Sequence, residues 1–332
     1  HQRLFNAPKG RVTTSFPSCF VHEQKGPTDV KILRNYTLEI GCLFITNIAT
    51  RILRELRSQG SLRGVTLWSY ATVAEEDNDG GGPMFYMRDA LESGELQRVP
   101  DVVLLTEPTG SAKHGALGIY RGQRGRMQIE VEVVGKSSHG SMPREGRNPL
   151  EHGAAIIAEA AAAHERGEGM GTDPFLGPGS RTASFATLRT PSDCAVPETF
   201  TCRMDRRLTA DEDPESALGD ISRLESGRRA REAGLQVDVR VPTYEDPTWK
   251  GYVLGNLQIY PGWVTPESHP AIAAAQECYL QTITPMVEDG LLGSSSARQP
   301  RVDRWVFSTD GVGVPVEAEL AEKPAANKAW VE

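Results

Sequence analysis

The 332-residue chain lacks the patterns that mark two large classes of protein. It has no run of lysine and arginine interleaved with aromatic residues, and its formal net charge is −8. Both features argue against a nucleic-acid-binding surface. No apolar stretch approaches the ~20 residues of a membrane span, and no charged and then apolar signal segment opens the chain. The expected partner is therefore a small molecule, with no nucleic acid and no membrane.

Paired cysteines are also missing. The five cysteines are odd in number, widely scattered and never arranged as Cys-x-x-Cys. This usage argues against a structural zinc knuckle and is typical of a reducing compartment, so the sequence predicts a cytoplasmic location. The chain has no internal repeat, and its length suits about two domains.

The first third of the chain predicts alternating helices and strands. Residues 1–45 have no clean period, but apolar residues then recur at helical spacing up to Gly60. Residues 65–74 predict a strand, residues 84–94 a helix, and residues 101–107 a continuous apolar strand of the kind buried in a parallel sheet. Alternation of this kind predicts an α/β domain with a mostly parallel sheet.

A different pattern begins near Gly118. Four predicted strands (126–134, 182–189, 200–208 and 235–241) and two predicted helices (148–164 and 214–233) follow in the order βαββαβ. This order is the ferredoxin-like arrangement. A helix at 270–282 and a strand within 304–312 return to the first domain. We therefore expect an α/β domain interrupted by a ferredoxin-like lid, with boundaries at 1–117 (1–45 atypical), 118–242 and 243–332.

Three carboxylates are the first candidate site. Glu75 and Glu76 end an apolar, β-prone run and precede a glycine-rich turn, and Glu107 ends the next predicted strand. Consecutive strand residues point to opposite sides, so one carboxylate could bind a metal while its neighbour handles protons. Carboxyl ends of parallel strands meet at one sheet edge, and like charges gathered there favour a bound cation. The alternative is a solvated acidic turn, with Glu107 capping a helix or facing solvent.

Two further clusters carry candidate residues. His139 lies in a glycine-flanked loop, where an imidazole held over a cleft can donate to a developing oxyanion; the alternative is an ordinary surface histidine. In the run Asp205, Arg206 and Arg207, one arginine could pair with the aspartate and another could receive a substrate carboxylate. A plain surface ion pair is the competing interpretation.

The motifs together resemble a known family. They are AEED at 74–77, TEPT at 106–109, GQRGRM at 122–127, GKSSHGSMP at 135–143, VPE at 196–198 followed by DRR at 205–207, and FSTDG at 307–311. In their order they resemble the zinc-dependent acetylornithine deacetylase, succinyl-diaminopimelate desuccinylase and glutamate carboxypeptidase metallopeptidases, closest to the selenium-metabolism-linked hydrolase subgroup. The resemblance spans residues 46–325.

The resemblance implies a role for each candidate residue. Glu75 would be the general base, and Glu76 and Glu107 would be ligands in a centre of two zinc ions per subunit, with cobalt or manganese as alternatives. His139 would stabilise the oxyanion, often in the partner subunit's site, and Arg207 would bind a substrate carboxylate. The lid domain would form a homodimer.

Some family features are missing. We find no clear His-x-Asp strand motif, no bridging aspartate in register and no C-terminal histidine, so the resemblance predicts a chain incomplete at both ends. The predicted function is a metal-dependent amidohydrolase or peptidase that cleaves an N-acyl amino acid or short peptide with a metal-activated water. Two alternatives stay open: an inactive remnant acting as a dimeric ligand-binding or structural protein, and a lid that serves alone as an interaction module.

Overall fold

The computed structural model describes residues 31–32, 40–61, 68–69, 75–94, 96, 100–107, 109, 117–248, 251–292 and 299–314. Side chains are not described at 31–32, 40–47, 69 and 76–77. The chain divides into two compact units, His1–Val73 and Ala74–Glu332.

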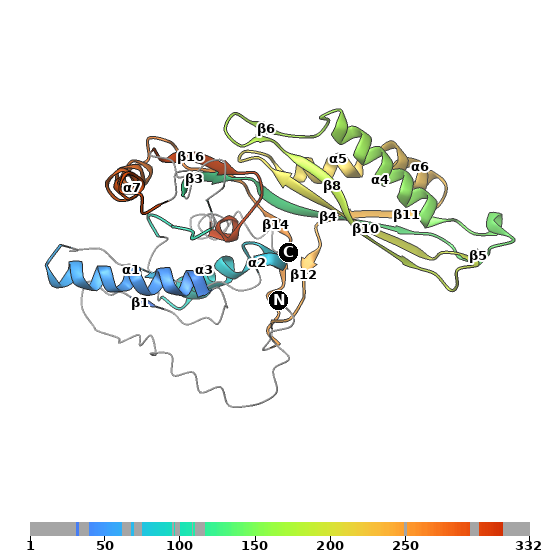
Figure 1. The fold of residues 1–332 in the computed structure, drawn as a ribbon. Helices are drawn as coiled ribbons and strands as arrows, with labels where there is room; N and C mark the ends of the chain where they lie inside the picture. Colours follow the sequence, from blue (N-terminus) through green and yellow to red (C-terminus); the bar gives the residue numbers. More distant parts are fainter. Residues whose placement is uncertain are drawn as a thin grey trace. The chain divides into compact units, whose positions relative to one another are not determined.

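Among its described residues, the first unit contains the long helix α1 (Figure 1) and two short strands. Helix α1 (Ile40–Ser58) begins earlier than the apolar spacing predicts and ends just before Gly60, whose φ of 76° suits a residue without a Cβ. Strand β1 (Lys31–Ile32) pairs in parallel with β2 (Trp68–Ser69). The predicted helix is confirmed, and the strand predicted at 65–74 is confirmed at β2, the rest lying outside the described residues.

The second unit begins with two helices and a small mixed sheet. The helices are α2 (Glu75–Asn78) and α3 (Gly81–Glu92), the second of which confirms the helix predicted at 84–94. In the sheet, β3 (Gly118–Gln123) lies between β15 (Trp263–Val264), its antiparallel partner, and β16 (Arg301–Trp305), its parallel partner. Helix α7 (Pro270–Glu288) packs against β3, and the turn η3 (Asp310–Val312) follows β16.

The strand predicted at 101–107 is wrong. Residues 102–107 are irregular and pair with none of the described strands. Val102, Val103 and Leu104 are 48%, 44% and 80% exposed, so the apolar run is not buried as a parallel strand would be. A strand needs backbone partners on a neighbour as well as apolar side chains, and the run alone does not provide them.

The ferredoxin-like fold is confirmed. Its four long strands are β4 (Gly125–Val134), β8 (Ser180–Arg189), β10 (Thr199–Leu208) and β11 (Gln236–Arg240). They form an antiparallel sheet in the order β11-β4-β10-β8, which β14 (Ile259–Tyr260) extends at the start of β4. Its helices, α4 (Pro149–Glu165), α5 (Pro214–Ser222) and α6 (Glu225–Glu232), lie on one face of this sheet (Figure 1). The chain order is βαββαβ, as predicted.

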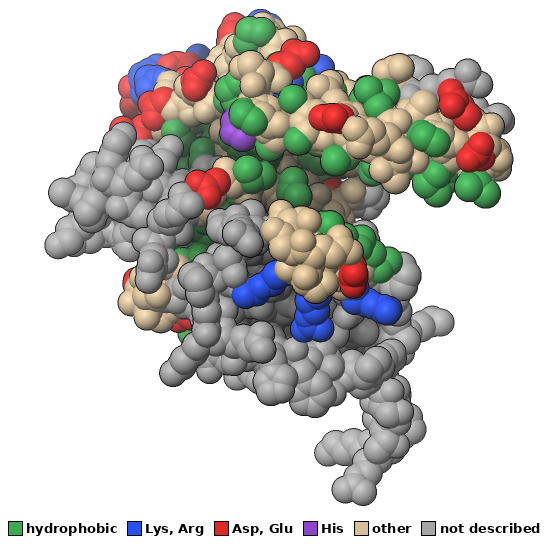
Figure 2. Space-filling model, turned by 90° about the vertical axis from the view of Figure 1, so that its left-hand side faces the viewer, with side chains coloured by type: hydrophobic (Ala, Val, Ile, Leu, Met, Phe, Trp, Pro, Cys, Tyr) green, Lys and Arg blue, Asp and Glu red, His purple; other side chains and the backbone are tan. Residues whose placement is uncertain are grey.

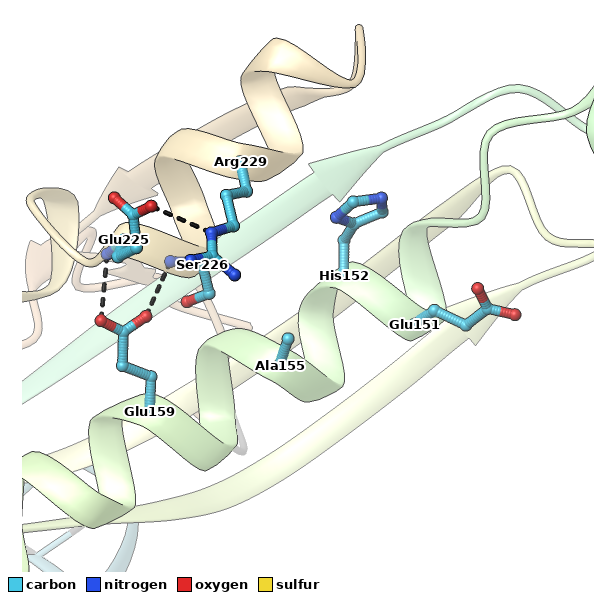
Figure 3. A pocket seen from close by; sticks show the side chains of 7 residues that line it. All are labelled: Glu151, His152, Ala155, Glu159, Glu225, Ser226 and Arg229. Atoms are coloured by element: carbon cyan, nitrogen blue, oxygen red, sulfur yellow. Dashed lines mark hydrogen bonds and ion pairs between the residues drawn. The ribbon is translucent and has the colours of Figure 1, made fainter.

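The helix predicted at 214–233 is two helices. Asp213 caps the first of them, with its carboxylate accepting from the N–H groups of Glu215 and Ser216. Leu224 then has a non-helical backbone, with φ −56° and ψ 138°. The Glu159 carboxylate from α4 accepts from the N–H groups that start α6 (Figure 3). A carboxylate at a helix N-terminus satisfies donors that lack an internal partner, so it stabilises the new start.

The core of the lid lies between its sheet and its helices. Alternate residues of β4 (Ile129, Val131 and Val133) are fully buried, as are their neighbours on β10. Burying a side chain of this size stabilises the fold by about 1.5–3 kcal/mol. Gly153 of α4 lies so near Phe200 that a Cβ there would come within 2.1 Å of the ring. The sheet and α4 therefore need glycine at this contact.

Short elements complete the described part. They are β5 (Ser138–His139), η2 (Pro143–Glu145), β6 (Thr172–Asp173), β7 (Gly177–Pro178), β9 (Ala195–Val196), β12 (Thr243–Tyr244) and β13 (Asn256–Leu257). On the face shown in Figure 2, apolar, acidic and basic side chains are interspersed among the described residues. None of the helices in the described part is both long and apolar enough to cross a membrane.

Candidate active site

A cavity of about 450 Å³ in the second unit brings several predicted site residues together. Its lining consists of Glu75, Asp79, Glu107, Arg126, Arg207, Trp305, Phe307, Ser308 and Thr309. This volume lies within the usual range for small-molecule sites. The structure therefore gathers Glu75, Glu107 and Arg207 from three separate segments into one space.

A larger cavity, of about 540 Å³, lies between α4 and α6 and holds none of the predicted site residues (Figure 3). One of its carboxylates, Glu159, is already engaged as the cap of α6. These hydrogen bonds outweigh the effect of burial and lower the pKa of Glu159. We therefore place the candidate site in the smaller cavity, where the chemically useful groups converge.

Two arginines form one wall of the cavity. Arg126 of β4 and Arg207 of β10 are directly opposite each other in the antiparallel pair. Like charges in such a position repel unless they are neutralised. Arg126 Nη1 donates to Asp79 Oδ2 at 2.9 Å, and its Nε lies 3.5 Å from Asp205 Oδ1. Burial lowers the pKa of Arg126, but Asp79 and then Asp205 raise it by more, so Arg126 keeps its charge beside Arg207.

Arg207 is oriented with one face left for a ligand. Its Nε donates to Asp205 Oδ2 at 2.8 Å and its Nη1 to Ser308 Oγ at 2.7 Å. Its Nη2 makes no hydrogen bond with the described residues, and the side chain is 24% exposed. Asp205 and Arg207 are two residues apart on β10 and so share a face. One arginine thus both pairs with Asp205 and lines the cavity.

The other arginine of the run has a structural position. Arg206 is fully buried on the opposite face of β10, where it pairs with Glu212 and donates to the backbone oxygen of Gly169. Burial lowers its pKa, against the opposing charges of Glu212 and Asp220. Arg206 therefore stabilises the lid and takes no part in the cavity.

Glu75 is positioned by a helical turn and not by a strand end. It begins α2, and its backbone oxygen accepts from the N–H of Asp79 at 2.9 Å. Neighbouring residues on a helix differ by about 100° around the axis, so the strand-based argument that Glu75 and Glu76 face opposite sides is wrong. The Glu76 side chain lies outside the described residues. Glu75 is half-buried and lines the cavity.

A buried polar network fixes the turn that carries Glu75. Asn78 donates to Asn256 Oδ1 at 2.9 Å, and its own Oδ1 accepts from the Tyr260 hydroxyl at 2.8 Å and from the Gln258 amide. All four side chains are at most 7% exposed. Because Tyr260 belongs to β14 and β14 pairs with β4, the network connects α2 to the strand that carries Arg126. Sequence reasoning missed these residues, since no motif joins positions so far apart.

The backbone after Asn78 turns sharply. Asp79 has a φ of 40°, a left-handed conformation that aspartate tolerates better than most residues. It is followed by Gly80, which lies against Gly313; a Cβ on Gly80 would come within 2.2 Å of the Gly313 nitrogen. Thr309 and the buried Gln123 form a hydrogen bond of 2.7 Å that holds the loop before η3. These contacts bring the segments of Asp79 and Phe307 to the same cavity.

His139 does not line the cavity. It is exposed on β5, which pairs with β9, and its Nδ1 lies 2.7 Å from Ser141 Oγ and accepts from the Ser141 N–H at 3.2 Å. The neighbouring Cys194 is a free, exposed cysteine. The structure therefore separates this candidate from Glu75, Glu107 and Arg207.

Comparison with known proteins identifies the lid. Residues 121–224 match the family model M20_dimer, the peptidase dimerisation domain. This dimerisation domain begins within β3 and ends between α5 and α6. The uncharacterized protein YgeY of Escherichia coli strain K12 is 34% identical over 249 residues, which cover 75% of this chain and 54% of YgeY. The chain spans about half the length of the curated relatives that it matches.

Solved structures of similar fold include two peptidases. The aminopeptidase PepT from Bacillus cereus has a TM-score of 0.48 at 15% identity, and a tripeptidase from Staphylococcus aureus has 0.47 at 16%. Each alignment covers 80% of this chain and 57% of the other. The match of residues 121–224 confirms the dimerisation domain predicted within this α/β chain.

The described residues do not complete a metal centre. No group of three or more histidine, cysteine, aspartate or glutamate side chains among them could hold an ion. The cavity contains the carboxylates of Glu75 and Glu107, a third carboxylate engaged by Arg126, and no histidine. Zinc sites usually combine nitrogen or sulfur ligands with such oxygens. The residues in this part of the chain therefore do not fit a zinc pair.

Proposed function

We propose that the protein cleaves the amide bond of an N-acyl amino acid or a short peptide. The observation that carries this proposal is that Glu75, Glu107 and Arg207, each expected in such a site, line one cavity. The match of residues 121–224 to a peptidase dimerisation domain supports a hydrolase acting on peptide or amide bonds.

Two side chains have direct roles in this proposal. Arg207, held by Asp205 and Ser308, binds the substrate carboxylate through its remaining donors. Glu75 accepts a proton from the attacking water and returns it to the leaving nitrogen, as a general base and then a general acid. Since His139 does not line the cavity of its own chain, its proposed role as oxyanion donor applies to the site of a second subunit.

The proposed hydrolysis depends on a bound metal. Glu76 and Glu107 stay the predicted ligands of zinc, cobalt or manganese. Because the described residues do not complete a metal centre, further ligands would have to come from other parts of the protein.

A homodimer through the lid follows from the same proposal. Strand β8 lies at the edge of the sheet, and its residues from 182 to 189 are all exposed. A long exposed edge offers unpaired backbone groups to another strand, so β8 of a second copy is the proposed partner. The domain boundaries stay predictions, at 1–117, 118–242 and 243–332. The cytoplasmic location also stays a prediction.

The test is the substitution Glu75→Gln, with Glu151→Gln on α4 as the matched control. We expect Glu75→Gln to lower hydrolysis of N-acetyl amino acids by about 10²–10⁴-fold, because an amide cannot accept the proton. Mass spectrometry should find its metal content unchanged, whereas Glu107→Ala should lower it. If Glu75→Gln hydrolyses these substrates as fast as the Glu151→Gln control, the role given to Glu75 is wrong.

A second candidate function is ligand binding without turnover. The lack of a three-ligand cluster among the described residues favours it. Purified protein with no tightly bound metal and no hydrolysis, but with measurable binding of N-acyl amino acids, would support this second candidate over the first.

A further inference from the structure

Part of the cavity wall is aromatic. Trp305 and Phe307 both line it, with ring centroids 4.6 Å apart and planes inclined by 36°. Phe307 is 44% exposed. An aromatic ring at a cavity wall is partly in contact with water. A ligand that covers the ring removes this apolar surface from water, which favours binding.

The tryptophan also contacts an aromatic ring that is not part of the cavity lining. Tyr120 of β3 stacks on Trp305 at 4.1 Å with an inclination of 21°. The Arg301 guanidinium lies 5.2 Å from the Tyr120 ring and donates to the Tyr120 hydroxyl. These contacts fix the Trp305 ring before any ligand binds, so the aromatic wall is preformed.

The carboxylate-binding arginine is attached to the same wall. Arg207 Nη1 donates to Ser308 Oγ at 2.7 Å, and Ser308 follows Phe307 in the chain. Consecutive Cα atoms are about 3.8 Å apart, so the guanidinium and the Phe307 ring belong to neighbouring positions of one wall. In an amino acid, the α-carboxylate and the side chain are likewise joined through a single carbon atom.

We propose that the cavity takes the carboxylate-bearing residue of its substrate with an aromatic side chain, such as an N-acylated phenylalanine. The α-carboxylate binds Arg207 and the side chain covers Phe307 and Trp305. This proposal rests on the proposed function for the reaction, but it concerns binding and is tested by binding. A small side chain would leave the Phe307 ring in contact with water, so the ligand would lose the binding free energy gained by covering the ring.

The experiment measures the affinity of the full 332-residue chain by titration calorimetry. The probes are N-acetyl-phenylalanine and N-acetyl-alanine, which share the carboxylate and differ in the ring. We expect the wild type to bind N-acetyl-phenylalanine about tenfold more tightly, the scale set by burying part of one aromatic side chain. Phe307→Ala should reduce this ratio to about one, and Phe307→Tyr should restore most of it. Leu291→Ala, which changes an exposed side chain outside the cavity lining, should keep the wild-type ratio.

Each result decides the proposal. Equal affinity of the wild type for the two probes, an unchanged ratio in Phe307→Ala, or no binding of either probe at millimolar concentration would overturn it. If the ratio behaves as expected but neither probe is hydrolysed, the aromatic site stands and the proposed hydrolase activity fails. If both probes are hydrolysed but the wild type binds them with equal affinity, the proposed hydrolase activity is supported and the proposed aromatic site is wrong.

Discussion

The buried Asn78 network gives the sharpest prediction for stability. The perturbation is Asn78→Ala, which removes an amide that makes four side-chain hydrogen bonds with three neighbours: Asn256, Gln258 and Tyr260. Alanine suits a helical turn, so α2 itself has no reason to unfold. The effect should come from the partners that are left behind.

The magnitude follows from those partners. Without Asn78, the Tyr260 hydroxyl and the Gln258 amide lose Asn78 Oδ1 as their acceptor, and Asn256 Oδ1 loses its donor. A buried polar group left unsatisfied costs about 1–3 kcal/mol. Water entering the emptied space would satisfy some of them. We therefore expect the free energy of unfolding to fall by about 3 kcal/mol, roughly one unsatisfied group at full cost.

The assay is urea unfolding at neutral pH, with Asn148→Ala as the matched control. Asn148 caps α4 from an exposed position, where its Oδ1 accepts from the Leu150 N–H at 3.1 Å. Loss of such a cap costs about 1 kcal/mol. An Asn78→Ala variant that loses no more stability than Asn148→Ala would refute the reasoning. Because Asn78 is three residues from Glu75, we also expect lower activity in Asn78→Ala and not in the control.

Three further predictions concern separate parts of the molecule. Burial raises the pKa of Tyr260 above its usual value of 10.0. The contribution of the neutral Tyr260 side chain to stability is therefore complete below pH 10 and is lost as the pH rises further. Between pH 8 and 11, the free energy of unfolding should fall more steeply in the wild type than in Tyr260→Phe. Phe185 on the exposed edge strand is 51% exposed, so Phe185→Lys should shift sedimentation from dimer towards monomer if β8 is the dimer edge. Arg207→Lys should raise KM about tenfold, because an ammonium cannot hold Asp205, Ser308 and a carboxylate in one plane; an unchanged KM would exclude Arg207 from carboxylate binding.

The lid could be predicted from its sequence because each element carries its own period. On β4, the alternate residues Ile129, Val131 and Val133 face the core, while the charged Glu132 between Val131 and Val133 does not. This period of two fixes the face of each strand without knowledge of its partner. The break at Leu224 was not predictable in the same way, since it depends on the Glu159 carboxylate of another helix.

The first domain shows where such reasoning fails. The apolar run at residues 102–107 has the composition of a buried strand, but composition does not supply a neighbour, and the run remains irregular and exposed. Even so, Glu107 reaches the same cavity as Glu75. The two carboxylates therefore line one cavity, as expected. The structural reason given for their meeting was wrong, because neither residue lies at the end of a described strand.

What holds the candidate site together is polar and distant in sequence. Asn78 meets Tyr260 across 182 positions, and Arg207 meets Ser308 across 101. A hydrogen bond of this kind has no period and no local spacing, so single-sequence reasoning finds the reactive groups but not the contacts that orient them. Those orienting contacts decide which face of Arg207 is left for a substrate. A substitution at Ser308 should therefore alter carboxylate binding, although nothing in the sequence around Arg207 points to that residue.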